Sequence, residues 1–125
     1  RDADQQPGDR GSEGERGRVF FYQSEMPYDP PSQAAWRSPT GDGYASYKIG
    51  NNVRTHEAWG LGVYHVFFKA PVAAANAIET PESPGIQLHH MLGFRLGGGK
   101  PGSGIRNVVN NRGGETIQAQ KAMVK

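Results

Sequence analysis

The chain contains no cysteine, so neither a disulfide framework nor a thiolate metal site is available to it. It also has no apolar run long enough to cross a membrane, and its first residues do not form a signal peptide. The chain has no large excess of positive or negative charge, because its formal net charge is +2, and its lysines and arginines are scattered. We therefore expect neither nucleic acid nor a membrane as a partner.

Glycine and proline, in contrast, are abundant. The 125 residues include 18 Gly and 9 Pro, whereas hydrophobic residues make up 35%. Both glycine and proline disfavour helix interiors, and together they suit short strands joined by many turns. The composition thus predicts an all-β protein, and the length suffices for one domain.

The chain divides into two parts by composition. Residues 1–18 consist largely of charged residues, glycine and glutamine, and they contain no aromatic side chain. Such a segment buries too little apolar surface to offset its conformational entropy, so it is predicted to be a disordered tail or linker. Residues 19–125 carry the strand-like patterns and form the predicted folded domain.

Short apolar segments recur along this second part at intervals of roughly twenty residues. Their marker residues are Val19, Ala45, Val63, Ile86 and Ile105. Repeats of this length, each with a strand and a Gly/Asn-rich turn, favour a solenoid of stacked parallel strands. We expect these parallel strands at residues 19–23, 61–68, 86–91 and 105–110.

The asparagines near the end of the last repeat agree with stacked turns. Asn107, Asn110 and Asn111 carry amides that are able to bond to the turn above. The alternative architecture is an antiparallel β-sandwich, which also places short strands and turns at regular spacing. Spacing alone leaves both architectures open.

Glu25 is the leading candidate for chemistry, because it stands between a hydrophobic strand and a turn stiffened by prolines. The stretch from Phe20 to Trp36 reads FFYQSEMPYDPPSQAAW. A carboxylic acid that donates a proton at neutral pH needs a raised pKa, and partial burial beside aromatic side chains has that effect. The alternative is that Glu25 caps a surface turn. The nearest second carboxylate, Asp29, is more typical of a residue that stabilises a turn before proline.

Aromatic residues and a histidine complete the predicted site. Tyr28, Trp36, His56 and Trp59 are assigned to substrate binding, because aromatic rings stack on the apolar C–H faces of sugars; burial in the core is the alternative for the tryptophans. The alternative function is a non-catalytic carbohydrate-binding β-sandwich that uses Trp36, Trp59 and Tyr64. The stretch THEAWGLG is not a zinc HExxH motif, since Gly60 replaces the second histidine. We expect no metal and no cofactor.

Three stretches resemble the carboxy-terminal part of bacterial glycoside hydrolase family 55 proteins, which are exo-acting β-1,3-glucanases. They are FYQSEMPYDPPSQAAW (21–36), GYASYKIGNNVRTHEAWGLGVYHVFF (43–68) and GIQLHHMLGFRLGG (85–98). The resemblance covers residues 19–111. It implies two tandem right-handed parallel β-helices with the active site in the cleft between them.

The resemblance also implies a mechanism and a partner. Family members invert the anomeric centre and use a glutamic acid as general acid, and Glu25 is the residue that best matches this acid. The expected partner is β-1,3-glucan, and the expected location is extracellular. A chain of 125 residues is too short for two β-helices. We therefore expect a partial right-handed β-helix that belongs to a larger enzyme, with the rest of the parent enzyme on its N-terminal side, and no hydrolysis by the segment alone.

Overall fold

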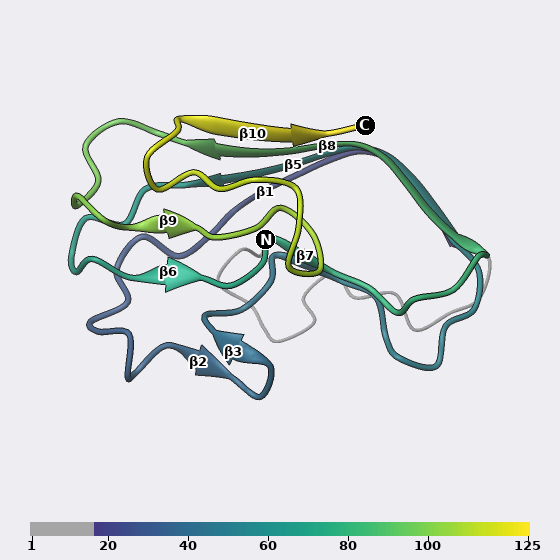
Figure 1. The fold of residues 1–125 in the computed structure, drawn as a ribbon, viewed down its shortest axis with the longest axis horizontal. Helices are drawn as coiled ribbons and strands as arrows, with labels where there is room; N and C mark the ends of the chain where they lie inside the picture. Colours follow the sequence, from purple (N-terminus) through teal and green to yellow (C-terminus); the bar gives the residue numbers. More distant parts are fainter. Residues whose placement is uncertain (1–16) are drawn as a thin grey trace.

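The computed structural model describes residues 17–125, and the regular elements in this range are all β-strands (Figure 1). The prediction of an all-β fold is therefore confirmed. Within these residues no helix is long and apolar enough to span a membrane. The long strands are β1 (Gly17–Glu25), β5 (His56–His65) and β8 (Ile86–Arg95), and β10 spans Lys121–Val124. The two-residue strands are β2 (Arg37–Ser38), β3 (Gly41–Asp42), β4 (Tyr47–Lys48), β6 (Ala73–Ala74), β7 (Ile78–Glu79) and β9 (Gly104–Ile105).

The long strands lie together in a four-stranded sheet with the order β1-β5-β8-β10 (Figure 1). β1 pairs with β5 and β5 with β8, both in parallel, so that Gly17, His56 and Ile86 share one row. β10 lies antiparallel on the far side of β8, with Val124 opposite Met91. Parallel pairing of the long strands is thus confirmed, and the alternative of an antiparallel β-sandwich does not describe them.

The repeat is longer than the sequence markers predicted. Neighbours within one row of the sheet are 39 residues apart between Gly17 and His56, and 30 residues apart between His56 and Ile86. The predicted spacing of twenty residues is wrong, because it combined strands from different sheets. Ile105 belongs to β9, which pairs with β6, and the strand expected at residues 105–110 is reduced to β9 and an isolated bridge at Val109.

The predicted tail boundary also shifts slightly. β1 begins at Gly17, so Gly17 and Arg18 belong to the sheet rather than to the tail. The remainder of the predicted tail, residues 1–16, lies outside the described residues.

The short strands stack in the same parallel manner as the long ones. Tyr47 of β4 pairs with Ile78 of β7, which bridges to Val109 in the next turn of chain. Ala73 of β6 pairs in parallel with Gly104 of β9. Each of these short strands therefore rests on its counterpart from the next repeat, and the inward side chains of the main sheet, the β4–β7 pair and the β6–β9 pair meet in one core.

Asparagine side chains bond successive turns to one another, as the sequence predicted. Asn111 donates its backbone N–H to Asn76 Oδ1 at 2.6 Å, and Asn76 Nδ2 donates to Asn111 Oδ1 at 3.4 Å. Asn110 Oδ1 accepts from the backbone N–H of Thr80 at 3.0 Å, while its Nδ2 donates to the Thr80 carbonyl at 2.8 Å. Asn107 Nδ2 reaches the Ala75 carbonyl at 3.3 Å. These amides satisfy backbone groups that the short strands leave unpaired.

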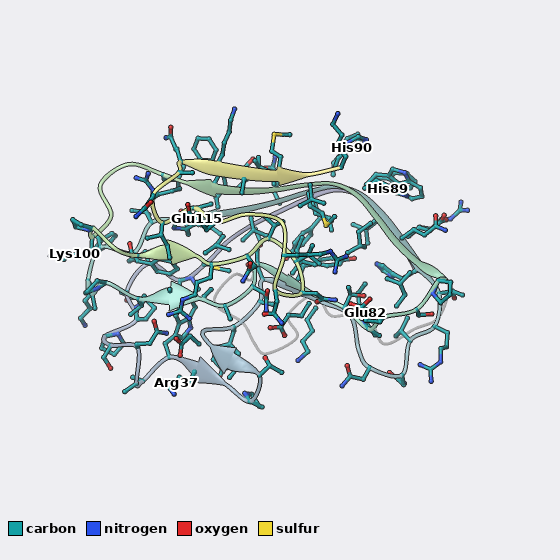
Figure 2. The ribbon with its side chains drawn as sticks, in the orientation of Figure 1. Arg37, Glu82, His89, His90, Lys100 and Glu115 are labelled. Carbon is teal, nitrogen blue, oxygen red and sulfur yellow. The ribbon has the colours of Figure 1, made fainter. Side chains whose placement is uncertain are left out.

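The three long strands bend at the same row. Phe21, Gly60 and His90 have positive φ angles of 58°, 73° and 62°, and the regular ladder omits them. A left-handed residue costs an L-amino acid about 1–2 kcal/mol, so this bend is unusual at a phenylalanine and a histidine. Figure 1 shows the strands turning together, and Figure 2 places His90 on the outer side of the bend.

Trp36 is a core residue rather than an exposed platform. It is 8% exposed, and its ring packs against Phe67 with 5.3 Å between the ring centroids. Gly43 provides the room for the indole, because a Cβ at this position would lie 2.9 Å from Trp36 Cζ3 and 3.0 Å from the Ala74 Cα. Gly43 also has a φ of 70°, which disfavours any other residue.

We predict that Gly43→Ala destabilises the chain by about 1–3 kcal/mol, since the new methyl group collides with Trp36 and the backbone is left-handed. Urea denaturation followed by tryptophan fluorescence measures the change. Gly97→Ala is the matched control, because a Cβ there meets no atom within 4 Å and the expected change is within about 0.5 kcal/mol. Equal stability of the two variants would contradict the packing described for Trp36.

Candidate functional site

Glu25 ends β1, the strand at the free edge of the main sheet. Its side chain is exposed, together with that of Gln23 two residues earlier, because alternate residues of a strand point to the same face. The backbone is held on the other side, where Met26 N–H donates to the Tyr64 carbonyl at 2.9 Å. The partial burial expected for Glu25 is therefore not present among residues 17–125. Among the described strands β1 has a neighbour on one side alone, and this explains the exposure.

Tyr64 lies beside Glu25 on the outer face of the sheet. The two residues are register partners, and parallel strands place such partners about 4.8 Å apart. Tyr64 also leans along its own strand over Gly62, where a Cβ would be 3.2 Å from Tyr64 Cε2 and 3.3 Å from its hydroxyl oxygen. The predicted hydrolase site omitted Tyr64, which the sequence analysis assigned to the alternative of a non-catalytic carbohydrate-binding domain. The sequence signal was the G-V-Y spacing, which puts glycine and tyrosine on one face of a strand.

Tyr28 follows Glu25 closely in the proline-rich turn, and it remains available for contact with a ligand. Its ring is 50% exposed and stacks on Phe68, with 4.8 Å between centroids and 22° between planes. The backbone is fixed as well, because Phe68 N–H donates to the Tyr28 carbonyl at 3.1 Å. Of the predicted aromatic residues, Tyr28 is the one closest to Glu25 in sequence.

Trp59 occupies the outer face of the sheet at a different place. Its register partner in β1 is Phe20, five residues before Glu25, which corresponds to roughly 16 Å of extended strand. Phe20 covers one face of the indole at 4.9 Å and 7°, and His89 covers the other at 5.5 Å and 21°. A sugar stacks on a free ring face, so this arrangement does not support the predicted role of Trp59.

The structure places two further predicted binding residues in the interior. Trp36 is packed as described above, and its small exposed part lines a shallow pocket of about 290 Å³ beside Asp29 and Tyr44. His56 is 2% exposed, and its Nε2 forms a hydrogen bond of 2.6 Å with the Tyr47 hydroxyl. Burial lowers the pKa of His56. The sequence could not separate these core residues from surface ones, because aromatic side chains serve both purposes.

A second buried histidine connects the core to the C-terminal segment. His65 is fully buried, and its Nε2 lies 2.7 Å from Thr116 Oγ1, which also accepts the Ile105 N–H at 2.9 Å. Arg95 Nε donates to the Thr116 carbonyl at 3.0 Å. Burial, together with the nearby positive charge of Arg95, lowers the pKa of His65 to about 4. This contact fixes the segment that leads into β10.

The chain is similar in sequence and in structure to known proteins. No family model matches the chain. An exo-β-1,3-glucanase from Streptomyces sp. (strain SirexAA-E / ActE) is 42% identical over 86 residues, which are 68% of this chain and 14% of the relative. The solved structure of sacteLam55A from Streptomyces sp. SirexAA-E matches 90% of this chain with a TM-score of 0.82 and 36% identity. A glutamate-to-alanine variant of sacteLam55A in complex with glucose matches with a TM-score of 0.81 and 35% identity. This chain spans 20% of each solved chain.

We predict that acid destabilises the chain through its buried histidines. The pKa of His65 is about 4 in the folded state and about 6.5 when unfolded, so protons favour the unfolded state. The stabilisation is complete above pH 6.5 and decreases as the pH falls toward 4. Between pH 7 and pH 5 His65 should account for a loss of about 2 kcal/mol in the free energy of unfolding. Urea denaturation across this range measures it.

The variant His65→Gln is the control, because glutamine does not titrate between pH 5 and pH 7. Its stability should depend less on pH over this interval, with a remaining contribution in the same direction from His56. A pH dependence unchanged from that of the parent chain would show that His65 does not carry the effect.

Proposed function

We propose that this chain, which belongs to glycoside hydrolase family 55 and matches its carboxy-terminal part, is a segment of an inverting exo-β-1,3-glucanase with Glu25 as the general acid. The observation that carries the proposal is the 42% identity with an exo-β-1,3-glucanase over 86 residues. Because the chain spans 14% of that relative, the remainder of the catalytic site is proposed to come from the parent enzyme on the N-terminal side.

The fold component of the proposal is a partial right-handed parallel β-helix. Parallel rows in the main sheet, in β4–β7 and in β6–β9 support it. Connections between parallel strands of one sheet are almost always right-handed, which gives the proposed hand. In such a stack the free edge of β1 receives the preceding turn of the parent enzyme. That turn would also provide the burial that Glu25 lacks within residues 17–125.

The position of Glu25 suits proton donation to a bound sugar. Its carboxyl group projects from the outer face at the end of a strand. The backbone hydrogen bond from Met26 N–H to the Tyr64 carbonyl fixes the position of the main chain next to Glu25. Pro27 begins the stiff turn that follows. In an inverting reaction the acid protonates the glycosidic oxygen while a carboxylate on the opposite sugar face activates water, with the two carboxyl groups about 6.5–9.5 Å apart. We assign the acid to this chain and leave the base to the parent enzyme.

Substrate and location follow from the same comparison. The sacteLam55A variant was solved in complex with glucose, which is the unit that exo cleavage of a glucan releases. We therefore propose β-1,3-glucan as the substrate. A polysaccharide cannot enter a cell intact, so the proposal includes an extracellular enzyme.

The role of Glu25 can be tested in a chimeric enzyme. Residues 17–125 replace the matched segment of the Streptomyces exo-β-1,3-glucanase, and release of glucose from laminarin is measured. The chimera should hydrolyse laminarin. Glu25→Gln should lower kcat by about 10²–10⁴-fold, because glutamine keeps the shape of the side chain but donates no proton to the leaving oxygen.

Asp29→Asn is the matched control, since Asp29 is an exposed acid in the same turn and should change kcat by less than about threefold. The binding of laminarin to the Glu25→Gln chimera should stay near that of the parent chimera. Full hydrolysis by Glu25→Gln would remove Glu25 from the mechanism and leave the segment as a non-catalytic carbohydrate-binding domain.

A further inference from the structure

We propose that Tyr64, lying over Gly62, forms an aromatic platform on which a glucosyl unit stacks beside Glu25. The inference rests on the proposed function and adds a substrate-binding residue to it. It stands on three observations: the position of Tyr64 in the row of Glu25, the glycine beneath its ring, and the contrast with Trp59, whose two ring faces are both covered.

The glycine determines how the Tyr64 ring lies. A Cβ at Gly62 would be 3.2 Å from Cε2, 3.3 Å from the hydroxyl oxygen and 3.5 Å from Cζ of Tyr64. Three ring-end atoms at nearly equal distances show that the phenol end covers the backbone of Gly62, which is buried beneath it. A ring that leans over the strand in this way turns one face toward solvent, and Tyr64 is indeed partly exposed.

Among residues 17–125, no ring stacks face to face on Tyr64. Phe94, its register partner in β8, stands at 55° to the Tyr64 ring with 6.0 Å between centroids, which is a tilted contact and not a face-to-face stack. Trp59 differs, because nearly parallel rings cover both of its faces. Sugar rings carry axial C–H groups that pack on an open aromatic face. Tyr64 offers such a face on the same outer surface as Glu25.

The arrangement places sugar and acid side by side. Neighbouring strands are about 4.8 Å apart, so a ring resting on Tyr64 lies within one strand spacing of the Glu25 side chain. Gln23, which faces outward on β1 next to Gly62, supplies an amide at the rim that can bond to sugar hydroxyls. The ligand class that fits is a short β-1,3-linked gluco-oligosaccharide.

The test uses the 125-residue chain labelled with ¹⁵N and titrated with laminaritriose, and amide shifts give the Kd. The largest shifts should fall at Gly62, Tyr64 and their neighbours in β1. Tyr64→Ala should weaken binding by about fivefold to tenfold, whereas Tyr64→Phe, which keeps the ring, should bind within about twofold of the parent. Gly62→Val should weaken binding to a similar degree, because its Cβ and two methyl groups occupy the space over which the Tyr64 ring lies.

Phe21→Ala is the matched control, because Phe21 is an exposed aromatic residue of the same sheet whose ring lies over Gly60, outside the proposed platform. Its Kd should equal that of the parent chain, and the dispersion of the amide spectrum establishes that each variant is folded. An unchanged Kd in Tyr64→Ala, or no binding by the parent chain, would overturn the platform. The proposed function is tested separately by the hydrolysis of laminarin by the chimera, because that assay depends on Glu25 and does not use the laminaritriose titration.

Discussion

Parallel pairing in register is the constraint on which the rest of this structure depends. Because β1, β5 and β8 run in the same direction, each residue stands beside its counterpart in the next repeat, and the row from Phe20 through Trp59 to His89 becomes a stack of rings. The same register aligns the residues with positive φ, so the three strands bend together. Backbone bonds along the rows fix every side chain of the outer face to within one strand spacing of its neighbour.

This constraint also explains why the candidate site lies where it does. Glu25 belongs to the edge strand of the main sheet, so Tyr64 lines one side of the acid, and no other strand of residues 17–125 lines the opposite side. Glycines act at two points on β5: Gly60 makes room for the Phe21 ring, and Gly62 makes room for the Tyr64 ring. In both cases an aromatic ring of the outer face occupies the space that a glycine leaves.

Sequence reasoning reached the strand content and the stacked asparagines, because glycine-rich turns and amide positions are local features. The prediction of parallel pairing was correct, although the twenty-residue spacing that favoured it was not. It missed the repeat length, since two-residue strands such as β9 leave no periodic signal and were equated with long ones. It also assigned Trp36 and His56 to the surface, although Gly43 and Tyr47 hold them in the core. Burial depends on partners that are distant in sequence, and an aromatic side chain has the same pattern in a core as in a binding site.

The central claim, that Glu25 donates a proton to the leaving oxygen, is tested most directly by the dependence of kcat/KM on the leaving group. The chimera and its Glu25→Gln variant are compared on a series of aryl β-glucosides whose phenols differ in pKa. Protonation matters least for the best leaving groups, so the variant should approach the parent chimera there and fall far below it for the poorest. A loss of equal size across the whole series would contradict the claim, because it would mean that Glu25 positions the sugar or supports the turn.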